Sequence, residues 1–164
     1  MSTSAKLIFF CGKMAAGKSS RARKFAVREN AVLLVQDELL DALFPGEITD
    51  IQAFVDRYSR LRNALTPHIC ALLLRGTSVV LDFAAATKAQ RLWFRELIES
   101  TNVAHELHFI DVSDGLCKSQ LRHRSEGLPA GTPWITEADF EAINSYFQPP
   151  TEDEKFNVVR HKRG

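Results

Sequence analysis

The sequence has no long hydrophobic run and almost no net charge. Its longest apolar segments, such as residues 7–11 and 71–74, are far shorter than the roughly 20 residues that a membrane-spanning helix needs. The 21 basic and 20 acidic side chains leave a formal charge of +1. The overall charge therefore gives no reason to expect binding to nucleic acid or to a membrane.

Cysteine is also scarce. The three cysteines, Cys11, Cys70 and Cys117, are odd in number and show no metal-ligand spacing. We therefore expect reduced thiols. Residues 1–5 lack the basic region and the apolar stretch of a signal peptide. Together these features predict a cytoplasmic protein.

The rest of the chain alternates between short apolar runs and amphipathic stretches. Its 164 residues fit one domain, residues 1–164, and a hydrophobic content of 45% is sufficient for a core. We predict strands over residues 6–11, 31–36, 78–83, 104–112 and 155–159, and helices over residues 18–30, 51–74, 87–100 and 136–146. This order predicts a three-layer α/β domain with a mainly parallel sheet.

Two local features refine this prediction. Pro67 should kink or split the helix over residues 51–74. Residues 160–163, Arg-His-Lys-Arg, are most simply a solvated terminus, because four residues make a thin footprint for nucleic acid. In a parallel sheet the carboxyl ends of the strands share one edge, where ligands bind. Functional residues should therefore lie at that edge.

Residues 12–19 match the phosphate-binding pattern G-x-x-x-x-G-K-[ST], between a predicted buried strand and a predicted helix. The glycines allow the backbone to turn tightly, so that N–H groups point toward phosphate oxygens. Lys18 should reach the β- and γ-phosphates of ATP, and the Ser19 hydroxyl should bind Mg²⁺. The predicted nucleotide-binding residues are Gly12, Lys13, Met14, Ala15, Ala16, Gly17, Lys18, Ser19 and Ser20.

Two acidic residues follow predicted strands. Asp37 is placed to accept a proton from a substrate hydroxyl, or alternatively to cap the helix that follows it. Asp82 ends the run Val-Val-Leu-Asp, which resembles a Walker B element, and is assigned to the metal site or to substrate. Arg91 lies in the first turns of the next helix, where contact with substrate is open.

Arg122 and Arg124 precede a Gly/Pro-rich segment, residues 127–133. We interpret residues 122–135 as a small lid that closes over ATP and brings positive charge to the transferred phosphoryl group. The alternative is a solvated helix end stabilised by the helix dipole.

These residues together resemble the small P-loop kinases of the AAA_33, or zeta-toxin-like, group, which is akin to chloramphenicol phosphotransferase and to polynucleotide 5′-hydroxyl kinase. The resemblance covers nearly the whole chain. It implies a P-loop NTPase fold of the nucleoside-kinase type. It also implies that Asp37 acts as the base and that Arg122 and Arg124 act from the lid. The chain is too short for a true AAA+ machine.

The first hypothesis is a kinase that uses ATP and Mg²⁺ to phosphorylate a hydroxyl of a small molecule. Its catalytic residues would be Asp37, Lys18, Arg122 and Arg124, with Ser19 and Asp82 at the metal. The alternatives are a nucleotide-binding regulatory module with slow hydrolysis, and a polynucleotide 5′-hydroxyl kinase, against which the balanced charge argues. We expect a monomer or a homodimer that binds neither membrane nor nucleic acid.

Overall fold

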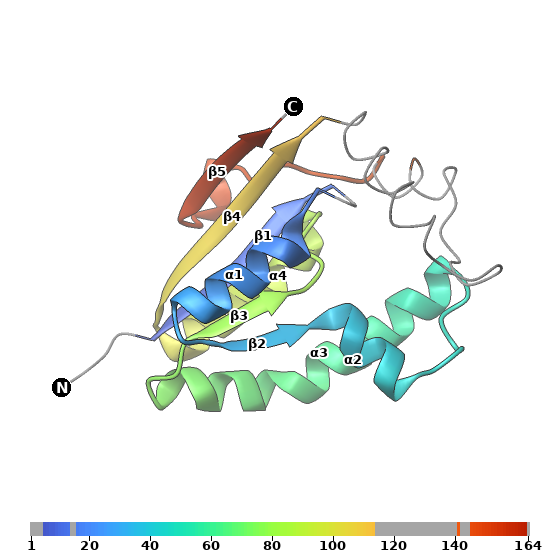
Figure 1. The fold of residues 1–164 in the computed structure, drawn as a ribbon, viewed down its shortest axis with the longest axis horizontal. Coiled ribbons are helices and arrows are strands. Elements are labelled where there is room, and N and C mark those ends of the chain that lie inside the picture. Colours follow the sequence, from blue (N-terminus) through green and yellow to red (C-terminus); the bar gives the residue numbers. More distant parts are fainter. Residues whose placement is uncertain (1–4, 14–15, 114–140, 142–144, 164) are drawn as a thin grey trace.

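Five parallel strands form one sheet, in the order β2-β3-β1-β4-β5 (Figure 1). The computed structural model describes residues 5–13, 16–113, 141 and 145–163. The strands are β1 (Lys6–Gly12), β2 (Val32–Val35), β3 (Val79–Asp82), β4 (Ala104–Val112) and β5 (Val158–Arg163). The predicted parallel sheet is confirmed.

Helices cover both faces of this sheet, which gives three layers (Figure 1). The helix α1 (Lys18–Arg28) packs on one face through Ala22, Phe25 and Ala26. The other face carries α2 (Gln36–Leu43), α3 (Ile51–Leu74) and α4 (Lys88–Thr101). A short 3₁₀ helix, η1 (Glu152–Glu154), precedes β5. None of the helices described by the structure combines the length and the apolarity needed to cross a membrane.

The central strand β1 is buried from both sides, as its continuous apolar run predicts. Leu7, Phe9 and Cys11 point into the core beneath α3 and α4, whereas Ile8 and Phe10 point into the core beneath α1. This alternation follows from the two-residue period of a strand. The loop that follows β1 is therefore anchored in the most buried part of the protein.

Of the two outcomes predicted for Pro67, a kink or a split, the split does not occur, because α3 runs unbroken through that residue. Proline removes one N–H donor and crowds the preceding turn, but apolar burial on both sides compensates. Tyr58 and Leu61 before it, and Ile69 and Leu73 after it, pack into the same core. Tertiary packing therefore overrides the local preference.

The helix α4 begins as predicted at Thr87, whose hydroxyl accepts a hydrogen bond from the Gln90 N–H at 3.1 Å. The Gln90 side chain in turn accepts from the Thr87 N–H at 3.3 Å, which completes a capping box. Two apolar residues, Val27 of α1 and Leu92 of α4, are exposed to 84% and 64%, although the amphipathic patterns of their helices favour packing into the core. Both lie on the solvent side of their helices.

The C-terminal strand lies later in the sequence than predicted. It spans Val158–Arg163, so the basic residues assigned to a solvated terminus belong to the sheet. Arg160 pairs with Asp111 of β4. Cross-strand pairing with β4 explains the difference, because it satisfies backbone groups that a free tail would leave to water.

Arg91 holds the C-terminal segment against α4. Its side chain is fully buried, and its Nε and Nη2 donate to the Glu154 carboxylate at 2.7 and 3.1 Å. Its Nη1 donates to the Ala85 carbonyl at 2.8 Å. The contact between Arg91 and a substrate that the sequence left open is therefore wrong. Arg95, one turn further along α4, donates to the carbonyl of Glu154 at 2.7 Å.

The change Glu154→Gln should destabilise the fold by about 3 kcal/mol, because it leaves the buried Arg91 charge without a carboxylate. Denaturant unfolding measures this difference. Glu152→Gln, an exposed change in the same turn, is the control and should have little effect. Equal stability of the two variants would contradict the role of the pair.

Candidate active site

The phosphate loop joins β1 to α1 at the carboxyl edge of the sheet. Gly17, the residue before α1, has φ 99° and ψ 20°, a conformation that favours glycine. A Cβ atom at Gly12 would lie 2.9 Å from the Ile110 carbonyl oxygen, so a side chain there would collide with β4. The local geometry thus explains why both positions of the motif are glycine. Met14 and Ala15 lie outside the described residues.

Lys18 points back across the loop. Its ammonium donates to the carbonyl oxygens of Gly12 at 2.7 Å and Lys13 at 3.1 Å. A cation at this position, at the amino end of α1, creates a positive environment suited to phosphate. The structure thus places the Lys18 ammonium at the phosphate loop, and its contact with the β- and γ-phosphates stays a prediction.

Ser19 and Asp82 meet at the same edge. The Ser19 hydroxyl donates to the Asp82 carboxylate at 2.6 Å. Hydroxyl and carboxylate oxygens are donors that Mg²⁺ prefers, and this ion usually takes only one or two carboxylates besides water and phosphate. The pair therefore fits a magnesium site. Within the described part of the chain, no cluster of three or more His, Cys, Asp or Glu side chains is arranged to hold a metal.

Asp37 lies beside this pair because β2 is the neighbour of β3. Val35, the last residue of β2, pairs with Asp82, and Asp37 follows two residues later in the first turn of α2. The interpretation of Asp37 as a helix cap is wrong, because Val35 occupies the cap position and no side chain caps this helix. Asp37 is therefore available for chemistry.

The electrostatic environment of Asp37 favours the protonated carboxyl. Desolvation, and then the nearby Asp82 carboxylate, raise the pKa of Asp37, although the residue as a whole is open to solvent. Lys18 and a hydrogen bond of 3.4 Å from the Gln36 side chain act in the opposite direction. A carboxyl with a raised pKa is suited to proton transfer.

The loop between β3 and α4 forms the wall next to Asp37. The Ala84 N–H donates to the Gln36 side chain at 2.8 Å, and the Tyr58 hydroxyl donates to the Ala84 carbonyl at 2.9 Å. The Gln148 N–H donates to the Ala86 carbonyl at 2.8 Å. Elements distant in sequence thus fix this loop.

Sequence reasoning missed Gln36 and Tyr58. Gln36 appeared as the end of a strand, whereas it is the first residue of α2 and is only 5% exposed. Tyr58 appeared as one of many apolar residues on the face of α3. An amide directly before an acid, at the end of an apolar run, was the available signal for Gln36, while nothing in the sequence distinguished Tyr58 from core residues.

Several predicted residues lie outside the described part of the chain. These are Arg122 and Arg124, together with the whole predicted lid over residues 122–135. Their roles therefore stay predictions.

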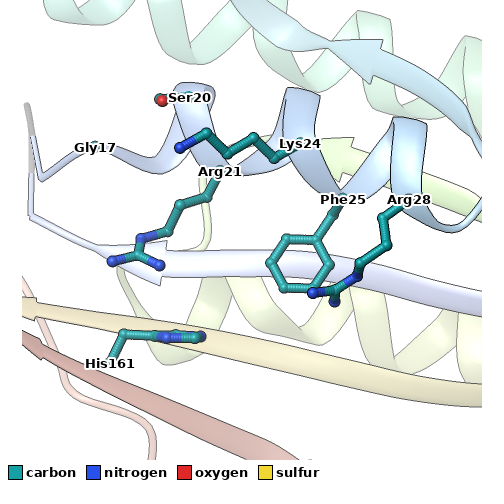
Figure 2. A pocket seen from close by; sticks show the side chains of 7 residues that line it. All are labelled: Gly17, Ser20, Arg21, Lys24, Phe25, Arg28 and His161. Carbon is teal, nitrogen blue, oxygen red and sulfur yellow. The ribbon is translucent and has the colours of Figure 1, made fainter.

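A second feature lies on the face of the sheet that α1 covers, between α1 and β5 (Figure 2). It is an open groove of about 570 Å³, lined by Gly17, Ser20, Arg21, Lys24, Phe25, Arg28 and His161. The three cationic side chains come from one face of α1, and none of the described residues that line the groove is acidic, although Arg28 pairs with Glu29 at 3.3 Å. The groove begins at the end of the phosphate loop, and its cationic side chains continue from there along α1.

His161 reaches this groove from β5 and is also part of a histidine pair. Its Nε2 lies 2.8 Å from Nδ1 of His108, whose other ring nitrogen lies 2.9 Å from the Glu106 carboxylate. Burial, together with the charge of Arg21, lowers the pKa of His161. The pair therefore adds packing and hydrogen bonds beneath α1 without adding charge near neutral pH.

The chain is similar to known kinases in fold. A suggested kinase from Chloroflexus aurantiacus superposes with a TM-score of 0.76 at 17% identity, over 99% of this chain and 86% of the other. Kti12 from Chaetomium thermophilum, in complex with ADP-AlF3, has a TM-score of 0.72 at 15% identity, over 95% and 88%. A gluconokinase from Sinorhizobium meliloti has a TM-score of 0.60 at 16% identity, over 98% and 84%.

The family assignment comes from the sequence itself. No curated protein matches the chain. The family AAA_33, described as an AAA domain, matches residues 7–150, which include the phosphate loop, Asp37 and Asp82. The five-stranded parallel sheet agrees with the fold of the kinases above. The chain belongs to the AAA_33 family and has the fold of the P-loop kinases.

Proposed function

We propose that this protein is a kinase that transfers the γ-phosphoryl group of ATP to a hydroxyl of a small molecule. The observation that carries this proposal is the placement of Asp37 beside the pair formed by Ser19 and Asp82, at the end of the phosphate loop. A site for nucleotide hydrolysis alone does not require a second carboxylate of raised pKa. The complex of Kti12 with ADP-AlF3 supports an adenine nucleotide.

The residues divide the work as follows. Asp37 accepts the proton of the acceptor hydroxyl, and the oxygen of that hydroxyl bonds to the γ-phosphorus. The bond between the γ-phosphorus and the bridging oxygen of the β-phosphate breaks, which releases ADP. Lys18 stabilises negative charge on the phosphate oxygens. Mg²⁺, held by Ser19 and Asp82, would neutralise further phosphate charge when bound. The acceptor would lie against α3 and the loop between β3 and α4.

Replacing Asp37 with Asn should leave ATP affinity nearly unchanged and reduce kcat at least about 100-fold, because the amide cannot accept the proton. Calorimetry measures ATP affinity, and ADP release with a screened acceptor measures transfer. Asp41→Asn is the matched control, since Asp41 lies one turn further along α2. Unchanged turnover in the Asp37 variant would remove this residue from the mechanism.

The raised pKa of Asp37 predicts the direction of the pH dependence. Transfer requires the ionised carboxylate, so kcat/KM should fall as pH decreases through a value above the ordinary aspartate pKa of about 3.9. Gln36→Leu removes a hydrogen bond that lowers this pKa, and should move the acid limb to higher pH. If the acid limb of the pH profile lies at the same pH in the variant and in the wild type, this would contradict an influence of Gln36 on the pKa of Asp37.

A second candidate, a polynucleotide 5′-hydroxyl kinase, is favoured by the basic groove. Arg21, Lys24 and Arg28 recur at steps of three and four residues along α1, so they present one positive face. This face is the basic stripe that the composition did not reveal. It would contact the phosphates of a nucleic acid.

A 5′-hydroxyl oligonucleotide tests this candidate. If the oligonucleotide binds along the groove, the logarithm of its association constant should fall linearly with the logarithm of the salt concentration. The slope should be about −2, the value for contacts with three phosphates of a single strand. Changing Arg21, Lys24 and Arg28 together to Glu should abolish binding. The control changes the exposed Arg23, Arg60 and Arg75 to Glu. Equal loss in both variants, or no binding at all, would exclude the groove.

A further inference from the structure

Among the described residues, Arg62 has no carboxylate partner, and it lies on the wall of the candidate active site. Its Nε is buried and has no hydrogen-bond partner, and within the described residues its guanidinium forms no ion pair. The two other arginines of the same helix differ in their ion pairs, although the Nε of Arg57 is likewise buried without a hydrogen-bond partner. Arg57 pairs with Glu47 and Asp56, and Arg60 pairs with Asp56.

Two aromatic rings hold the Arg62 guanidinium in place. Its Cζ lies 4.4 Å from the centre of the Tyr58 ring and 6.0 Å from that of the Trp93 ring. Both rings are themselves anchored, Tyr58 by its hydrogen bond to the Ala84 carbonyl and Trp93 by a bond of 2.9 Å to the Thr66 hydroxyl. The cation is therefore positioned by contacts that leave its charge unneutralised.

A continuous series of contacts links this cation to Asp37. The Asp37 carboxylate accepts from the Gln36 side chain, which also binds the Ala84 N–H. The Ala84 carbonyl accepts from Tyr58, and Tyr58 stacks beneath Arg62. The candidate base and the unpaired cation therefore belong to one wall, formed by α2, α3 and the loop after β3.

A partly buried guanidinium favours an oxyanion, because its planar N–H groups match a carboxylate or a phosphate. We propose that Arg62 binds an anionic group of the acceptor, so that the substrate class is a hydroxylated carboxylate or phosphate compound. The reaction at its hydroxyl rests on the proposed function. The recognition of the anion by Arg62 is measured separately, by binding.

Calorimetry with the full-length protein, saturated with ADP and Mg²⁺, tests this proposal. The probes are matched pairs that differ in an anionic group: sorbitol and gluconate, glucose and glucose 6-phosphate, uridine and UMP. In at least one pair the anionic member should bind about tenfold or more tightly than the neutral one, the difference expected for a hydrogen bond to a charged group. The pair that responds distinguishes a carboxylate from a phosphate.

Variants at position 62 identify the residue responsible. Arg62→Gln should abolish the preference for the anionic member, while Arg62→Lys should retain part of it, since lysine keeps the charge but not the fork of donors. Arg60→Gln is the control on the same helix. Unchanged ADP affinity and an unchanged unfolding midpoint show that a variant is folded. If Arg62→Gln unfolds, the Arg62→Lys variant alone tests the proposal. A preference for the anionic probe equal to that of the wild type would then contradict recognition by the forked N–H donors of Arg62.

Three results would overturn the proposal: equal affinity within every pair, no binding of any probe, or an anion preference that survives in Arg62→Gln. Failure of the proposed function is a different result. Anion binding that depends on Arg62, without phosphoryl transfer to any bound probe, would leave the anion site intact and exclude the kinase reaction for these compounds. Transfer to neutral acceptors alone would support the kinase and remove the role of Arg62.

Discussion

The parallel pairing of β1 with β3 is the constraint on which the rest of the site depends. It brings the end of β3 to the same edge as the phosphate loop, so that Asp82 meets the Ser19 hydroxyl at 2.6 Å. The adjacent pairing of β2 with β3 then places Asp37 beside Asp82. Backbone hydrogen bonds in a buried sheet hold this order, because breaking them would leave polar groups unpaired away from water.

The loop between β3 and α4, next to Asp37, is held differently, by side chains instead of strands. The amide and carbonyl groups of residues 84–86 bind Gln36, Tyr58, Arg91 and Gln148, which come from separate parts of the chain. The buried pair of Arg91 and Glu154 connects this loop to the C-terminal segment. In the proposed kinase, a rigid wall beside the candidate base would keep an incoming hydroxyl at a defined position, which is how positioning accelerates a reaction.

Much of this arrangement follows from the sequence. The pattern over residues 12–19 predicts a tight turn at its glycines and a helix from Lys18; Gly17 is in a left-handed conformation and α1 begins at Lys18. The apolar run of β1 predicts burial on both faces, and Thr87 with Gln90 predicts the start of α4. Such features depend on neighbours within a few residues, so local patterns are sufficient to reveal them.

Other features depend on residues brought together from distant positions. Arg91 and Glu154 are 63 residues apart, and the basic residues after Val158 belong to β5 only because β4 lies beside them. That no carboxylate of the described residues pairs with Arg62 likewise depends on which acidic side chains the fold brings near it. The sequence by itself therefore determined the phosphate loop, the parallel sheet and the two edge carboxylates. Only the tertiary structure decided which charges are paired, because a pairing energy depends on distance and burial, which no local pattern contains.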